Sequence, residues 1–172
     1  MTIKKQGIGT WICLLALVFA LIGLILYGTA VRAGDQLQIA SGSEFFYDMA
    51  RPEDSAMPPV VVPCAVIAIL FLAAALVLGQ FRLEGTAGKV RDVVVGLLRI
   101  AAPALLVIAL FYFLYGSFTG IGWTFFSNAE LAIYPAATAV GKQVVTGLVF
   151  FALAMIGAAM AAYFEIPKKT AE

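Results

Sequence analysis

The chain has 172 residues, of which 63% are hydrophobic and 12% are charged, and its formal net charge is +1. Its mean hydropathy of +1.01 lies far outside the range of soluble domains, so we expect an integral membrane protein in contact with the lipid bilayer. The small net charge and the lack of a basic stripe argue against nucleic acid as a partner. The sequence has no histidine, the commonest metal ligand and general base, so we expect no metal site and no cofactor.

Four long apolar runs follow one another along the chain. They cover residues 9–31, 60–81, 95–117 and 138–164. Each is about as long as the roughly 20 residues that cross a hydrocarbon core about 30 Å thick, which predicts four transmembrane helices in one domain. For the first run a cleaved signal peptide is the alternative, because Lys4 and Lys5 precede it and residues 28–30 are small. The run nevertheless exceeds the roughly 7 to 15 apolar residues of a signal peptide.

Basic residues set the expected orientation. In a four-span chain most of them fall on one side, namely Lys4, Lys5, Arg82, Lys89, Arg91, Lys168 and Lys169. Cytoplasmic connections of membrane proteins carry the excess of lysine and arginine. We therefore expect both termini in the cytoplasm, and the segments 32–59 and 118–137 on the outer face of the plasma membrane.

The outer segment 32–59 is acidic, and it contains a candidate helix start. Ser41 and Glu44 have the spacing of a capping box, in which each side chain satisfies a free backbone N–H. The pattern leaves room for a short helix through the aromatic residues 45–47 at the membrane surface. A surface loop whose rings pack on neighbouring helices is the simpler interpretation.

Two features of the apolar runs bear on packing. Arg99 is the one charge in the third run, and it follows the short loop expected at residues 82–92 closely enough for its guanidinium to reach the interface. A functional charge within the membrane is the alternative. In the fourth run Ala154, Ala158 and Ala162 recur every four residues, which predicts a face where another helix packs closely, more commonly one of the same chain.

The two cysteines give no sign of redox chemistry. Cys13 lies near the inner end of the first run, and Cys64 lies near the outer end of the second. A disulfide needs Cα atoms within about 7 Å, so we do not expect one. We interpret both as small apolar packing residues.

The candidate site lies in the stretch 116–142, where polar, aromatic and charged residues interrupt the apolar sequence. A turn is expected at its first glycines, and a second capping box at residues 127–130 predicts a helix start. Pro135 either kinks that helix or lies in the first turn of the next one. The predicted binding residues are Trp123, Asn128, Glu130 and Lys142. The alternative is purely structural, with an interfacial tryptophan, a helix cap and an exposed charge pair.

The same stretch carries a resemblance. Residues 121–123 (IGW) followed by 127–130 (SNAE), leading into a fourth apolar helix, resemble a family of small, uncharacterised bacterial four-span membrane proteins. The resemblance covers mainly the last third of the chain and the overall hydropathy. It implies no particular activity, and it implies a role related to carbohydrates only through the glycoside hydrolases near which members are often encoded.

The sequence therefore predicts an all-α integral membrane protein, a four-helix bundle of up-down topology. The favoured function is that of a non-enzymatic accessory, sensing or binding component with its site on the outer face. Its partner would be another membrane protein or further copies of the chain. A subunit of an oligomeric channel or transporter is the first alternative, and a membrane enzyme using an outer-face carboxylate is the second.

Overall fold

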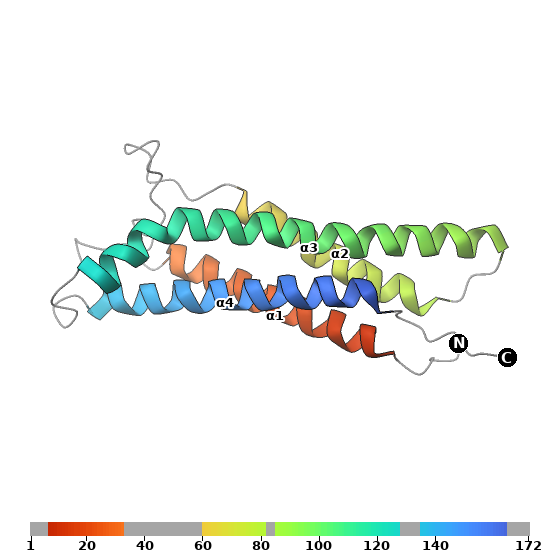
Figure 1. Ribbon diagram of the computed structural model, residues 1–172, viewed down its shortest axis with the longest axis horizontal. Helices are drawn as coiled ribbons and strands as arrows, with labels where there is room; N and C mark the ends of the chain where they lie inside the picture. The colour runs from red at the N-terminus through yellow and green to blue at the C-terminus, as the bar shows by residue number, and fades with distance from the viewer. Residues whose placement is uncertain (1–6, 33–59, 82–84, 128–134, 165–172) are drawn as a thin grey trace.

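The computed structural model describes residues 7–32, 60–81, 85–127 and 135–164, and in these residues all regular structure is helical (Figure 1). The elements are α1 (Ile8–Arg32), α2 (Val61–Gln80), α3 (Gly85–Gly122), the π-helical segment η2 (Trp123–Ser127) and α4 (Pro135–Tyr163). The predicted all-α four-helix bundle is thus confirmed. The first capping box, at residues 41–44, and the helix expected beyond it lie outside the described residues.

Each of the four α-helices is long and apolar enough to cross a membrane. The candidate spans are Ile8–Val31, Val61–Gln80, Gly85–Phe118 and Thr138–Tyr163. Large apolar side chains are exposed along all four helices, as expected where the surrounding medium is lipid rather than water. The chain is therefore a small polytopic membrane protein.

The helices run up and down, and the first residues of α1 and the last residues of α4 lie at the same end of the bundle (Figure 1). We call this the arginine end; there α1 and α3 begin and α2 and α4 end. The opposite end, where η2 lies, is called the π end. Helix α1 packs chiefly on α4, α2 packs chiefly on α3, and α3 and α4 join the two pairs, whereas α1 and α2 touch only sparsely.

Three buried aromatic rings fill the middle of the bundle. Tyr27 and Phe113 meet edge to face with ring centroids 4.8 Å apart, and Phe113 meets Phe151 in the same way at 5.8 Å. Two glycines make room for these rings: a Cβ placed at Gly23 would lie 2.9 Å from the Phe151 ring, and one at Gly147 would lie 3.1 Å from the Phe113 ring. The burial of the aromatic rings thus depends on glycines in α1 and α4, which leave the space that a side chain would occupy.

Small residues bring α1 and α4 together along most of their length. A Cβ at Gly157 would lie 3.2 Å from the Cβ of Ala16, so the two backbones approach closely. Ala154 and Ala158 are buried on this face as predicted, but Ala161 continues it, and Ala162 is only half-buried. The difference follows from the helical period of 3.6 residues, because a strict four-residue spacing drifts off the contact face. The partner is α1 of the same chain.

Helix α3 is longer at both ends than the sequence indicates. It begins at Gly85, within the loop expected at residues 82–92, and Gly116 and Gly120 lie inside it rather than in a turn. Near its end the glycines lie on the buried side of the helix. There tertiary packing outweighs the roughly 1 kcal/mol by which each glycine disfavours a helix.

Candidate functional site

The candidate site is organised by η2, which begins where α3 ends. The backbone changes from α-helical to π-helical at Trp123 and stays so through Ser127. In Figure 1 this end of α3, drawn in teal, leans toward the first turns of α4. Single π-helical turns are rare and are found disproportionately at functional sites. The structural irregularity therefore falls within the stretch that the sequence singles out.

A glycine of α4 receives η2. A Cβ at Gly141 would lie 3.0 Å from the ring of Phe125 and 3.3 Å from the methyl group of Thr124. Phe125 is half-buried by this contact, whereas Phe126 is 87% exposed. The η2 segment thus carries two neighbouring rings, one packed on α4 and one displayed at the surface.

Two hydroxyl groups, one near the end of α3 and one on η2, are fully buried. Ser117 donates a hydrogen bond to the carbonyl oxygen of Phe113 at 2.7 Å, as serines in membrane helices commonly do. Thr124 has no hydrogen-bond partner for its hydroxyl among the described residues. A buried hydroxyl is costly, by about 1 to 3 kcal/mol, when it has no hydrogen-bond partner, so Thr124 is a position where a further polar group would be favoured.

A polar contact between α1 and α4 lies near the same end. The Gln143 side-chain amide donates to the hydroxyl of Thr29. Thr29 in turn donates back to its own helix, with distances of 2.9 Å to the carbonyl of Ile25 and 3.1 Å to that of Leu26. A chain of polar groups therefore links α4 to α1 one residue beyond Lys142.

Of the four predicted site residues, the structure describes Lys142 in full and Trp123 by its backbone. Lys142 is exposed on α4, next to Gly141, and its carbonyl accepts a hydrogen bond of 2.7 Å from Thr146. Trp123 contributes the first residue of the η2 backbone, and its side chain is outside the description. Asn128 and Glu130 also lie outside the described residues, together with the second capping box. The predicted approach of Glu130 and Lys142 therefore stays a prediction.

Pro135 is the first described residue of α4, and several contacts were missed. Residues 128–134 lie outside the described residues, so the choice between a kink and a first turn stays a prediction. The Gly141–Phe125 packing and the Gln143–Thr29 contact were not anticipated from the sequence. The sequence did offer one signal for the packing at Gly141, which directly precedes the predicted site residue Lys142. Glycine often marks a position where another part of the chain comes close to the backbone.

At the arginine end, Arg99 has a role that neither sequence interpretation anticipated. Its guanidinium donates to the carbonyls of Ala161 and Phe164, at the C-terminal end of α4. The last carbonyls of a helix have no partner within the helix and carry its negative dipole end. Arg99 thus satisfies the end of a neighbouring helix, so its charge is held by protein groups instead of simply reaching out to the interface.

Arg91 does the same for α2. It donates to the carbonyl of Phe81, the residue that follows α2, and it also binds the carboxylate of Asp92 with an Nε–Oδ1 distance of 3.0 Å. Eight residues separate Arg91 from Arg99, which turns the second side chain by about 80° around the helix. The two arginines can therefore serve helices on different sides of α3.

No metal-binding cluster adds to these contacts within the described residues, where no three histidine, cysteine, aspartate or glutamate side chains come together. Cys13 and Cys64 are both free thiols, as expected. Comparison with protein-family models, curated proteins and solved structures gives no match to the chain. The class that the fold defines is thus a four-span helical membrane protein, and a role has to be argued from its geometry.

Proposed function

We propose that this protein is a non-enzymatic membrane component that binds a partner, or senses one, through its π end. The observation that carries the proposal is η2. It follows the end of a long helix, buries the Thr124 hydroxyl without a described partner and displays Phe126. A conformation with these costs is typical of sites retained for recognition.

The proposed binding residues are Trp123, Asn128, Glu130 and Lys142, to which we add Phe126. Lys142 and Phe126 are exposed on two elements that contact each other, α4 and η2. An exposed ring at the same end of the bundle as an exposed cation suits a protein partner, because aromatic side chains carry much of the energy of protein interfaces. The proposed partner is another membrane protein.

The proposed location is a bacterial plasma membrane with the π end outside and both termini in the cytoplasm. Its support is the bias of lysine and arginine toward the arginine end, where Lys89 and Arg91 lie. Four spans agree with the resemblance to the small bacterial family, and membership of that family is part of the proposal.

A channel or transporter subunit is the alternative that the packing constrains most. Tyr27, Phe113 and Phe151 fill the middle of the bundle. A path for ions or solutes would therefore have to run between several copies of the chain. The polar groups that line such a path would have to lie on the surfaces where the copies meet. A homogeneous oligomer without a foreign subunit would turn attention to this alternative.

The test is capture of the partner from native membranes in mild detergent, with a pair of matched variants. Phe126→Ala removes the exposed ring at the π end, and Tyr163→Ala removes a ring that is equally exposed at the arginine end. We expect a stoichiometric partner that is lost with Phe126→Ala and retained with Tyr163→Ala. Equal capture by both variants would contradict binding at the π end.

The charged part of the site needs its own variants. Glu130→Gln and Lys142→Gln each remove a charge with little change in side-chain size. We expect each to weaken capture, because a charge pair that meets a partner contributes to specificity. Capture unchanged by both substitutions, in protein that remains folded, would remove these two residues from the proposed site.

A further inference from the structure

Contacts between helices fix the relative heights of α3 and α4, where height means position along the bundle axis. At the arginine end the guanidinium of Arg99 binds the carbonyl of Phe164, the residue that follows α4. Toward the π end a Cβ at Gly147 would lie 3.1 Å from the ring of Phe113, so these two residues share one height. Helix α3 therefore continues beyond α4 at the arginine end, as Figure 1 shows.

The apolar surface of the bundle ends at different heights on these two helices at the arginine end. On α4 it ends near Phe164, where the helix itself ends and its last carbonyls need polar partners. On α3 it continues past Arg99, because Leu97 is 62% exposed. It ends where charged side chains begin, with Asp92, which is 67% exposed, and Lys89. Seven residues separate Asp92 from Arg99, so the apolar surface extends about 10 Å further along α3 than along α4.

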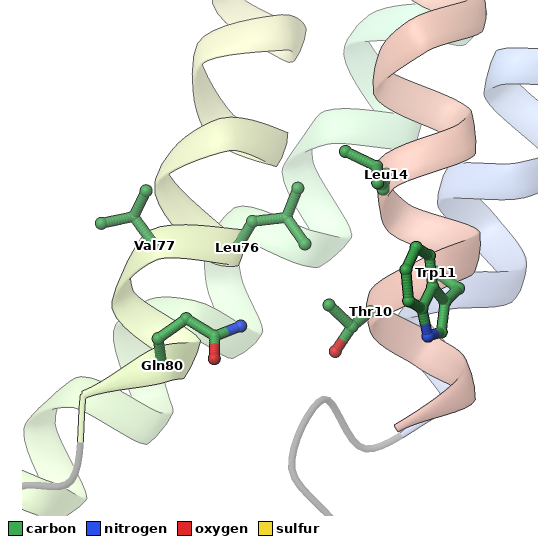
Figure 2. A pocket seen from close by; sticks show the side chains of 6 residues that line it. All are labelled: Thr10, Trp11, Leu14, Leu76, Val77 and Gln80. Atoms are coloured by element: carbon green, nitrogen blue, oxygen red, sulfur yellow. The ribbon is translucent and has the colours of Figure 1, made fainter. Parts of the chain in front are cut away.

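A groove between α1 and α2 indicates that the end of α2 has an apolar surface as well (Figure 2). The groove has a volume of about 320 Å³, and almost all of its lining surface is apolar. Its lining residues are Thr10, Trp11, Leu14, Leu76, Val77 and Gln80. Arg91 binds the carbonyl of Phe81, directly after α2, so the groove and the apolar start of α3 lie at similar heights. Lipid tails suit both surfaces.

A membrane of ordinary thickness leads from these positions to matching residues at the π end. A hydrocarbon core about 30 Å thick is crossed by about 20 residues of helix. Counted from Asp92, they end at Tyr112 on α3. Counted from Phe164, they end at Val144 on α4, within two residues of Lys142. Tyr112 and Lys142 are both exposed, and tyrosine and lysine are common where hydrocarbon gives way to lipid headgroups.

The two ends of the bundle are offset in the same direction. Phe113, next to Tyr112, is level with Gly147, whereas the counted span on α4 continues three residues further. The span on α3 thus ends about 5 Å short of that on α4 at the π end, after extending about 10 Å beyond it at the arginine end. An inclined bundle has both offsets. With helix axes about 8 to 10 Å apart, a mean offset of about 8 Å corresponds to about 40°, the upper end of the range for membrane helices.

We propose that the bundle is inclined in the bilayer and that the last turns of α3, together with η2, project beyond the hydrocarbon to meet the partner. The chain from Tyr112 to Ser127 is long enough to rise about 15 Å above the hydrocarbon at this inclination. The headgroup layer is only about 5 to 8 Å thick. On this projecting part Phe118 is 68% exposed and Phe126 is 87% exposed.

The partner contact that follows lies outside the hydrocarbon. Exposed rings gain little by leaving lipid for a protein surface, but they gain much by leaving water. Phe118 and Phe126 therefore favour contact with an extramembrane segment of the partner over contact with one of its transmembrane helices. Contact at Phe118 rests on the proposed function, whereas the inclination does not depend on any partner.

Tryptophan fluorescence measures the inclination at the arginine end. In a Trp11→Phe, Trp123→Phe background, single indoles are introduced at exposed positions by Leu97→Trp on α3 and by Tyr163→Trp on α4. Their depths follow from quenching by phosphatidylcholine brominated at different positions of the acyl chain. Leu97 lies two residues nearer the arginine end than Arg99, so an upright bundle would place its indole no deeper than that at residue 163. We expect the Leu97→Trp indole to be about 5 Å deeper.

The same measurement at the π end should give the opposite sign. Tyr115 and Val145 are exposed, and each lies two residues from the Phe113–Gly147 contact, so they share one height. We expect the Val145→Trp indole on α4 to be about 5 Å deeper than the Tyr115→Trp indole on α3. Only an inclined bundle reverses the sign between the ends. Equal depths, or the same sign at both ends, would overturn the inclination.

Partner capture tests the contact outside the hydrocarbon. Phe118→Ala removes a ring from the projecting part. Phe111→Ala removes a ring that is 62% exposed on the same face of α3, seven residues or about 10 Å nearer the middle of the membrane. We expect Phe118→Ala to reduce capture about tenfold and Phe111→Ala to leave it unchanged. Equal loss in both variants would contradict an extramembrane contact. Capture that is lost with Phe126→Ala but retained with Phe118→Ala would also contradict it, while leaving the proposed function in place.

Discussion

Helix α1 meets its two neighbours in different ways. Its face toward α4 carries Gly9, Ala16 and Gly23. Residues of α4, or Phe164 directly after it, pack so closely on these three positions that little or no room is left for a larger side chain. Toward α2 it presents Trp11 and Leu14, which remain partly exposed around a groove. We call these the closed seam and the open seam.

The difference between the two seams shows that small residues allow close helix packing in a membrane. Lipid tails are as apolar as leucine, so a large apolar side chain gains little by leaving lipid for a helix interface. Close approach of two backbones does gain, because it increases packing and lets polar groups reach across. Residue size on each face of α1 therefore decides which neighbour it binds tightly.

The largest expected effect concerns the end of the closed seam. The carbonyl of Phe164 accepts from Arg99, and it lies where a Cβ at Gly9 would be only 2.8 Å away, so α1, α3 and α4 meet at this point. Arg99→Met should reduce the free energy of unfolding by about 2 to 3 kcal/mol, because charge-assisted bonds to two carbonyls are lost. Unfolding by sodium dodecyl sulfate in mixed micelles measures this.

The control for Arg99 keeps the charge. Arg99→Lys retains a cation but cannot reproduce the guanidinium fork on two carbonyls, so we expect it to recover only part of the lost stability. Arg99→Met with wild-type stability would mean that these contacts do not hold the bundle end together.

A smaller effect is expected from enlarging a glycine on the closed seam. Gly23→Leu should reduce the free energy of unfolding by about 2 kcal/mol, because its side chain would meet the buried Phe151 ring. Gly28, on the same helix, has open space where a side chain would go. Gly28→Leu should be neutral or slightly stabilising, since leucine favours a helix more than glycine does. The same micelle titration checks both, and equal losses would contradict the closed seam.

The smallest effect is expected on the open seam. Leu14 is 41% exposed in the groove wall. Leu14→Ala should therefore change the free energy of unfolding by about 0.5 kcal/mol or less, as is usual for exposed positions. Leu72→Ala, at a fully buried position where the seam closes, should cost about 2 kcal/mol or more. A large loss for Leu14→Ala would show that the two seams are packed alike.

Prediction from sequence succeeded where hydropathy decides the outcome. Four helices long enough to span follow from residue type and order. It did less well at the candidate site. The unusual stretch was recognised, but the packing of Phe125 on Gly141 involves segments whose registers are set only when α3 and α4 are paired. The partners of Arg99 were not anticipated for the same reason, since they are backbone carbonyls, which every residue has.

The sequence by itself determined that the chain is a membrane protein with four helical spans, because the cost of placing backbone and charge in lipid depends on composition and length alone. Only the tertiary structure decided that α3 extends through its glycines, that it ends in a π-helical turn and that α1 is sealed on α4 but open toward α2. These features depend on which side chains meet across helices, and in lipid that choice rests on local fit rather than on hydrophobicity.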